Sequence, residues 1–206
     1  MKVSFGSLVI GAGVCGLLSF VCLATSLGTD YWYIIQMNPG NVSDFEDMSS
    51  HSGLWTINEG EAITFPELHV MAGFSLPFQI FWINMHSAIV VVLSLSLVLL
   101  LFGSICGLVS SLARSPVLLT STASYFFICS LLTLSGVSLY IIYSYQALAE
   151  TERQVGPGGL AHIHTSFGWS LGMAWLSYGL ELLTALLLLA AVMSSITPFL
   201  PSCGQK

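Results

Sequence analysis

Long runs of apolar residues recur four times along the chain. A helix needs about 20 consecutive apolar residues to cross a bilayer core of about 30 Å, and each run is at least that long. The runs lack the alternation of membrane β-strands, and backbone groups inside hydrocarbon must be bonded within their own segment, so the pattern predicts helices. The predicted spans are residues 5–27, 83–112, 117–145 and 166–196.

The polar segments between these runs define the expected organisation. We expect a single domain over residues 1–206, of the all-α membrane class, with a long loop at 28–82 and a short one at 146–165. Within the long loop, residues 30–35 are rich in aromatic and β-branched residues, and residues 53–57 follow after a Pro-Gly break, so each is predicted as a short strand. These two strands are expected to form a small extracellular antiparallel sheet.

The few charged residues predict the orientation. Lys2, Arg114 and Lys206 stand beside span ends without acidic neighbours, whereas the loop at 28–82 holds seven acidic residues and no Lys or Arg. Loops poor in Lys and Arg are the translocated ones. The chain's sequon begins at Asn41 in that loop, and a sequon is glycosylated only on the lumenal side. We therefore expect cytosolic termini, a glycan on Asn41 and a plasma-membrane location.

The first span has a second interpretation as a cleaved secretory signal, because a basic residue and an apolar core precede Ala24. Its apolar run is longer than the usual 7–15 residues of a signal core, which favours a retained helix. Cleavage would leave the other three spans in the same orientation.

Composition excludes several function classes. The net charge of −6 arises mainly in the outer loops, so the chain offers no basic surface for nucleic acid. No catalytic triad, carboxylate pair or phosphate-binding glycine loop is evident, so we expect neither an enzyme nor a cofactor. His162 and His164 lack a third ligand nearby, which favours a solvated loop over a metal site. The five cysteines lie in spans or the tail, and Cys203 is a candidate for lipidation.

The aromatic motifs of the long loop resemble those of a known superfamily. Trp32 after the first span, Gly53-Leu54-Trp55 in the long loop and the short remaining connections are similar to the claudin superfamily, over the whole chain. This superfamily includes peripheral myelin proteins, epithelial membrane proteins and calcium channel gamma subunits. The resemblance implies a left-handed four-helix bundle with an outer sheet, in which Trp32 and Trp55 attach the sheet to the bundle.

The chain departs from the superfamily at one place. Members usually carry two cysteines after Gly-Leu-Trp that form a disulfide, but Asn58 stands about where the first is expected and no cysteine follows before Cys106. A disulfide is worth about 2–4 kcal/mol, so this loop is expected to be softer than a typical claudin loop. A variant segment at residues 62–80 is an alternative explanation.

Small residues at four-residue spacing give each of three spans a candidate packing face. Such faces permit close backbone approach in lipid, either inside this bundle or against another membrane protein or a second copy of the chain. The motif residues are Ala12 and Gly16 in the first span, Gly103, Gly107 and Ser111 in the second, and Gly168 and Gly172 in the fourth.

Glu181 is the one charged residue within a predicted span. An acid at a helix centre costs roughly 2.5–3.5 kcal/mol on insertion scales, so its carboxyl group should meet hydrogen-bond donors. An internal hydrogen bond is the first interpretation, a contact with a partner protein the second, and ion conduction the third.

Two function classes fit these features. The first is a claudin-like structural or adhesive protein at the plasma membrane or cell contacts, binding lipids and other membrane proteins in cis and in trans. The second is a gamma-like auxiliary subunit that regulates an ion channel or receptor.

Overall fold

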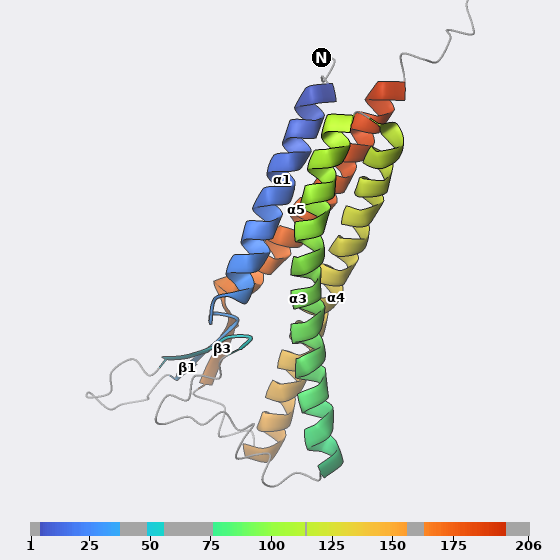
Figure 1. The fold of residues 1–206 in the computed structure, drawn as a ribbon. Coiled ribbons are helices and arrows are strands. Elements are labelled where there is room, and N and C mark those ends of the chain that lie inside the picture. Colours follow the sequence, from blue (N-terminus) through green and yellow to red (C-terminus); the bar gives the residue numbers. More distant parts are fainter. Residues whose placement is uncertain (1–4, 38–48, 56–75, 114, 156–162, 197–206) are drawn as a thin grey trace, which may run out of the picture. The chain divides into compact units, whose positions relative to one another are not determined.

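The computed structural model describes residues 5–37, 49–55, 76–113, 115–155 and 163–196. Four long helices and three short strands make up these residues (Figure 1). The predicted all-α membrane fold, a claudin-like four-helix bundle with a small antiparallel sheet, is confirmed. In chain order the elements are α1 (Phe5–Leu27), β1 (Tyr33–Met37), β2 (Ser49–Ser52), α3 (Leu76–Ala113), α4 (Pro116–Val155), β3 (Ile163–Phe167) and α5 (Trp169–Ile196).

All four helices are long and apolar enough to cross a membrane. The mean hydropathy of their most apolar parts is 2.3, 2.8, 1.9 and 2.0 in chain order. α4 begins at Pro116, where the missing N–H of proline costs nothing because the first turn has no partner for it. The helix continues to Val155 rather than ending at residue 145, because good helix formers such as Gln146, Ala147 and Leu148 follow the apolar run.

The chain forms two compact units, and each is described by itself. The first unit combines Met1–Ala24, Leu95–Leu134 and Trp175–Lys206, and the second combines Thr25–Ser94 and Ser135–Ala174. The expected single domain at 1–206 therefore stays a prediction.

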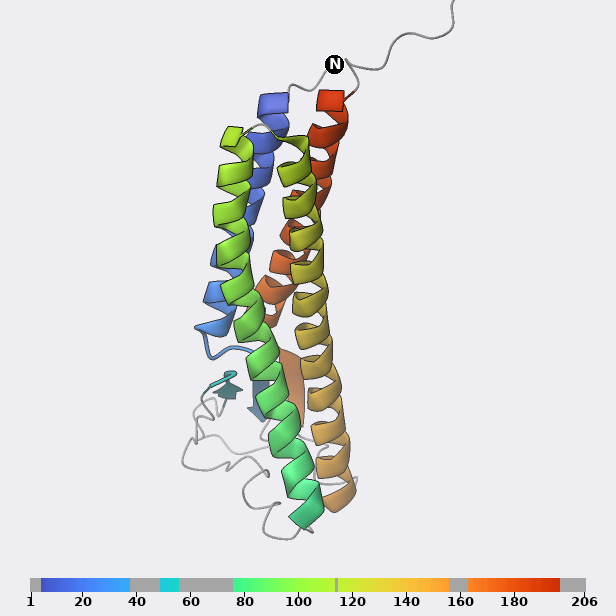
Figure 2. The same ribbon diagram turned by 45° about the vertical axis from the view of Figure 1, so that its right-hand side comes forward.

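Four antiparallel helix segments, one from each long helix, lie side by side in the first unit (Figures 1 and 2). The start of α1, the end of α3, the start of α4 and the end of α5 lie at the same end of this unit. A small apolar core fills that end, formed by Leu119, Ala191 and Val192, with Phe5, Leu8 and Val9 packed against it.

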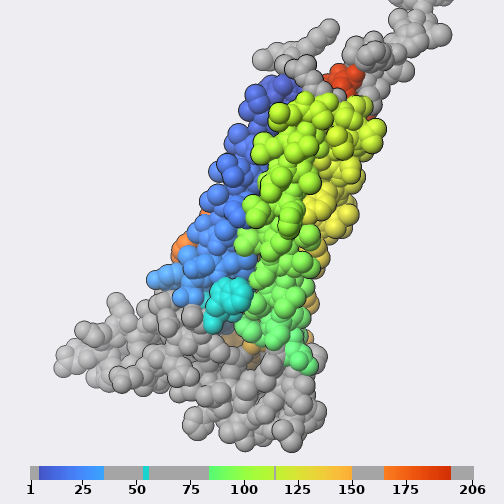
Figure 3. Space-filling view, viewed as in Figure 1, coloured from blue at the N-terminus to red at the C-terminus, as the bar shows by residue number. Residues whose placement is uncertain are grey.

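The outer surface of the first unit is apolar. Side chains of α1 and α3 cover the face seen in Figure 3, and many large ones are exposed, with Leu112 at 84% and Ile10 at 70%. Soluble monomers rarely expose contiguous apolar surface of this kind. The surface is that of a protein surrounded by lipid, as the apolar spans predict.

The second unit contains an antiparallel sheet with the strand order β2-β1-β3. The predicted pairing of two strands in the long loop is present, with Tyr33 opposite Ser52 and Gln36 opposite Ser49. The strand positions differ from the prediction, because β1 starts at Tyr33 rather than residue 30, and β2 ends before Gly53. Residues 53–55 are not a strand, and residues 56 and 57 lie outside the described part.

The third strand was not predicted. β3 pairs with β1 from Tyr33 opposite Phe167 to Met37 opposite Ile163. Its residues were assigned to the short loop and to the start of the fourth span, which instead begins at Trp169. Only Gly168 separates the strand from the helix, and Ser166 and Phe167 resemble the residues that begin α5, so hydropathy alone gives no boundary between them.

Candidate functional site

A buried polar cluster surrounds Glu181 in the first unit. Its side chain is 0% exposed, and its carboxyl oxygens accept hydrogen bonds from the hydroxyls of three residues. Thr133 of α4 lies 3.0 and 3.1 Å from the two oxygens, Ser177 of α5 lies 3.1 Å from Oε1, and Ser19 of α1 lies 3.4 Å from Oε1. Side chains of three helices therefore meet at one carboxyl group.

A fourth helix joins through Ser96 of α3, whose Oγ lies 2.6 Å from Oγ1 of Thr133. A hydroxyl has a single hydrogen. If Thr133 gives its hydrogen to the carboxyl group, Ser96 must be the donor in the contact between them. The result is a directed chain from Ser96 through Thr133 to Glu181.

The opposite side of the cluster is a reciprocal pair of serines. Oγ of Ser19 lies 2.9 Å from Oγ of Ser177, and each hydroxyl also lies within 3.1 Å of the other residue's backbone carbonyl oxygen. This geometry gives either hydroxyl an alternative acceptor on the facing helix. All five side chains of the cluster are 0% exposed, so each bond forms away from lipid and water.

The arrangement can fix helix register. Hydroxyl groups are the only side-chain donors to Glu181 among the described residues. Interhelical bonds between polar side chains in membranes stabilise by about 0.6 kcal/mol on average and reach about 1.7 kcal/mol. An axial shift of any one helix would separate its hydroxyl from the cluster.

The small residues singled out in the sequence lie in unlike surroundings. A Cβ on Gly103 would lie 2.8 Å from the ring of Tyr125, and one on Gly107 would lie 3.7 Å from Thr122, so both glycines face α4. Ser111 is partly exposed, and nothing lies within 4 Å of a Cβ on Gly172. Gly168 precedes α5 and is therefore not on a helix face.

In the first span, Ala12 is buried, and a Cβ on Gly16 would lie 3.5 Å from the ring of Phe126.

A second candidate site lies where α1 ends, in the second unit. The last carbonyl groups of a helix have no partner within it. The indole N–H of Trp32 donates to the carbonyl oxygen of Ser26, and that of Trp55 donates to the carbonyl oxygen of Leu27, both at 2.8 Å. Two tryptophans from separate segments thus cap the same helix end.

The buried ring of Trp32 also contacts α4. It is 0% exposed and packs edge-on against Tyr140, with 4.7 Å between ring centroids. Its backbone carbonyl accepts the N–H of Gly168 at 3.1 Å, which joins the end of β3 to the segment before β1. Trp32 therefore connects α1, α4 and the sheet.

Serine and threonine hydroxyls complete this junction. Ser26 donates to the carbonyl oxygen of Ser170 at 2.7 Å, and the hydroxyls of Thr29 and Ser170 lie 2.8 Å apart. Thr29 also donates to the carbonyl oxygen of Thr25 at 2.8 Å. The end of α1 and the start of α5 are thereby tied to each other.

The Gly53-Leu54-Trp55 motif has a steric explanation. A Cβ on Gly53 would lie 2.8 Å from the Cα of Asp30 and would also overlap its carboxyl group, so only glycine fits. Leu54 is 1% exposed, whereas the ring of Trp55 is 59% exposed beyond its bonded N–H. In this motif Gly53 permits a close backbone contact, Leu54 buries its side chain and Trp55 caps the end of α1.

The family model described as PMP-22/EMP/MP20/Claudin tight junction matches residues 67–190, more than half of the chain. The chain belongs to this claudin family. The matched region contains all of α3 and α4 and most of α5, together with Thr133, Ser177 and Glu181. Trp32 and Gly53-Leu54-Trp55 precede it, so those residues rest on the motif resemblance and on the geometry above.

The long loop at 28–82 of this claudin-family chain contains no cysteine. The four described cysteines, Cys15, Cys22, Cys106 and Cys129, are free thiols. In the described part of the chain, the two indoles and the hydroxyl of Thr29 all join the long loop to carbonyl groups at the end of α1.

Several predicted residues lie outside the described part, namely Asn41, His162 and Cys203. Within that part, no group of three metal-binding side chains lies together. From the sequence we did not predict Ser19, Ser96, Thr133 and Ser177 as a set, because hydroxyls are frequent in these spans. Gly136 was also missed, although a Cβ on it would lie 2.6 Å from the buried side chain of Leu93.

Proposed function

We propose that this protein is a structural or adhesive component of the plasma membrane at cell contacts, and that it acts by binding other membrane proteins. The claudin-family match carries the proposal. The junction at Trp32 and Trp55 supports it, because it fixes a sheet and its loops to the ends of apolar helices. A junction of this kind is suited to presenting loops to a neighbouring protein rather than to catalysing a reaction of a small molecule.

The proposed orientation follows from charge. We infer that both termini face the cytosol, that the loops at 28–82 and 146–165 face outward, and that Asn41 carries a glycan. The absence of Lys and Arg from the long loop and the position of the sequon support this. The two loops would then meet partners in trans, while the apolar helix faces would meet lipids, partners in cis or a second copy.

Within the family, we propose that the chain is most similar to transmembrane protein 235 and its sibling transmembrane protein 114. The segments that support this are residues 30–34, 49–55, 105–113 and 166–170. Three of them contribute to the junction just described, through Trp32, Gly53 and Ser170.

Proximity labelling of the full chain in native tissue, followed by mass spectrometry, tests the proposal. We expect junction and adhesion proteins among the labelled neighbours. A matched variant, Trp55→Leu, removes the indole bond to Leu27 and should reduce the labelling of outer-loop neighbours while leaving membrane insertion unchanged. A single recurrent channel or receptor in place of junction proteins would refute the adhesive role and support the auxiliary-subunit interpretation.

A further inference from the structure

The exposed side chains of the two units differ in chemistry. In the first unit the large exposed apolar side chains are mostly aliphatic, as in Ile10 and Leu112. In the second unit most of them are aromatic. Aliphatic side chains suit the acyl region of a bilayer, whereas Trp and Tyr are enriched where headgroups meet hydrocarbon. The exposed rings of the second unit belong to Tyr31, Trp55, Tyr145, Phe167 and Trp169.

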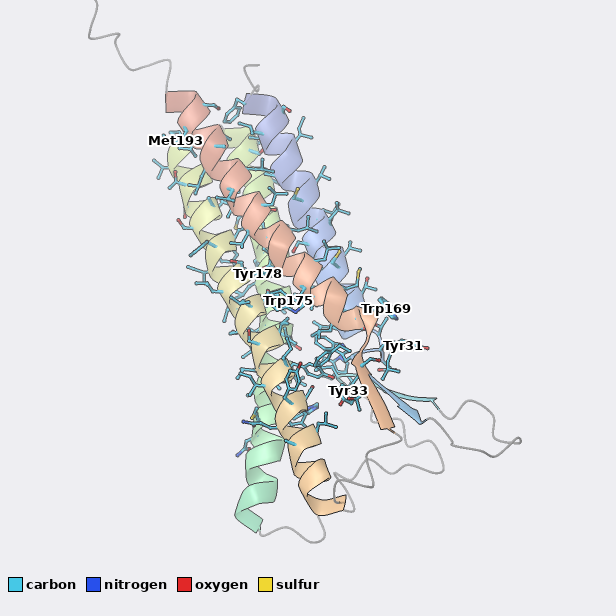
Figure 4. All side chains as sticks on the ribbon, turned by 180° about the vertical axis from the view of Figure 1, so that it is seen from behind. Tyr31, Tyr33, Trp169, Trp175, Tyr178 and Met193 are labelled. Atoms are coloured by element: carbon cyan, nitrogen blue, oxygen red, sulfur yellow. The ribbon has the colours of Figure 1, made fainter. Side chains whose placement is uncertain are left out.

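Two of these rings form a pair at the end of a span. Trp169 is the first residue of α5 and of its candidate span, and Tyr31 follows α1 by four residues. Their ring centroids lie 6.0 Å apart with an angle of 30° between the planes (Figure 4). Tyr31 remains 40% exposed and Trp169 50% exposed, so each ring keeps open surface after the contact.

The charges around this pair select among headgroups. Asp30 immediately precedes Tyr31, and the whole segment 28–82 contains acidic residues but no Lys or Arg. An anionic lipid would meet like charge from this segment. An ammonium group would be attracted both by the acids and by the electron-rich faces of Tyr and Trp rings.

We propose that Tyr31 and Trp169 form a contact surface for the choline group of phosphatidylcholine. The rings are too close for an ammonium group to lie between them, so it rests on their outward faces. Quaternary ammonium ligands are the ones that aromatic rings bind in this way. The proposal concerns lipid and does not depend on which proteins the loops bind.

The test uses the full chain in nanodiscs with equal amounts of phosphatidylcholine and phosphatidylglycerol of the same acyl chains. Native mass spectrometry after partial delipidation measures which lipid is retained. We expect phosphatidylcholine to be enriched, and the double variant Tyr31→Leu and Trp169→Leu to lower that enrichment about two- to five-fold, as the loss of exposed cation–π contacts predicts.

Two controls separate the rings from general disturbance. Trp175→Leu removes another exposed Trp of α5, from the first unit, and should leave the enrichment unchanged. The double variant Tyr31→Phe and Trp169→Phe keeps aromatic faces and should retain most of it, even if the leucine variant fails to fold. No preference for phosphatidylcholine in the unaltered chain, or an equal loss in Trp175→Leu, would overturn the proposal.

Discussion

Removing the carboxyl group of Glu181 should cost stability in proportion to its interhelical bonds. Thr133 contributes a good interhelical bond at 3.0 Å and Ser19 a long one at 3.4 Å, while the bond from Ser177 is within α5. In Glu181→Leu these hydroxyls keep other acceptors, since Thr133 can turn to the carbonyl oxygen of Cys129 at 3.2 Å. No buried hydroxyl is orphaned, so we expect a loss of about 1–2 kcal/mol.

A double-mutant cycle between Glu181→Leu and Thr133→Val isolates the free energy of the bond between these two side chains. Unfolding in mixed micelles should give a coupling of about 1 kcal/mol, because the two side chains share the shortest interhelical bond to the carboxyl group. Glu181→Gln keeps a carbonyl oxygen as acceptor and should cost less than Glu181→Leu, in stability and in surface expression. Ser124→Ala is the matched control, since this exposed hydroxyl bonds to the carbonyl oxygen of Thr120 within α4.

Additive effects of the two substitutions within about 0.3–0.5 kcal/mol would refute the cluster as a stabilising unit. Equal surface expression of Glu181→Gln and Glu181→Leu would refute the role of the hydrogen bonds. A loss in Ser124→Ala as large as that in Thr133→Val would show that any hydroxyl in these helices matters equally.

Three further predictions concern the helix end, helix packing and orientation. Trp32→Phe keeps a buried ring but loses the 2.8 Å bond to Ser26, so thermal unfolding in detergent should show a loss of about 1 kcal/mol, against about 3–5 kcal/mol for Trp32→Ala; equal losses would contradict the cap. Gly136→Ala should destabilise because its Cβ meets Leu93 at 2.6 Å, whereas Gly172→Ala, with open space, should be neutral or stabilising in the same assay; the reverse order would refute the packing argument. Asn41→Gln should abolish a glycosidase-sensitive shift in gel mobility, and an unaltered chain that shows no shift would count against an outward long loop.

Residues that differ from their local surroundings could be found from the sequence. Glu181 is an acid in an apolar run, and Trp32 belongs to a motif that is specific enough to suggest a family. The partners of Glu181 could not be found in this way. Serines and threonines in a helix can bond to the carbonyl four residues earlier, as Ser104 and Thr184 do, so only packing decides which hydroxyls turn to a neighbour.

Spacing also proved a limited guide to helix contacts. Gly103 and Gly107 lie against α4, but Gly172 has open space and Gly136, which stands in no motif, meets a buried side chain. A four-residue spacing shows that two residues share a face, yet it does not show which face points to another helix. The third strand was hidden for a related reason, because only Gly168 separates β3 from the apolar run of α5.

The sequence by itself determined that four helices cross the membrane, because the cost of exposing polar groups to hydrocarbon depends on local composition and length alone. Which side chains meet was decided only by the tertiary structure. Hydrogen bonds and steric contacts act over about 3–4 Å, and they join residues as far apart as Ser19 and Ser177 or Trp32 and Gly168. Apolar periodicity carries no information at that range, so the polar cluster and the capped helix end emerge only when the chain is folded.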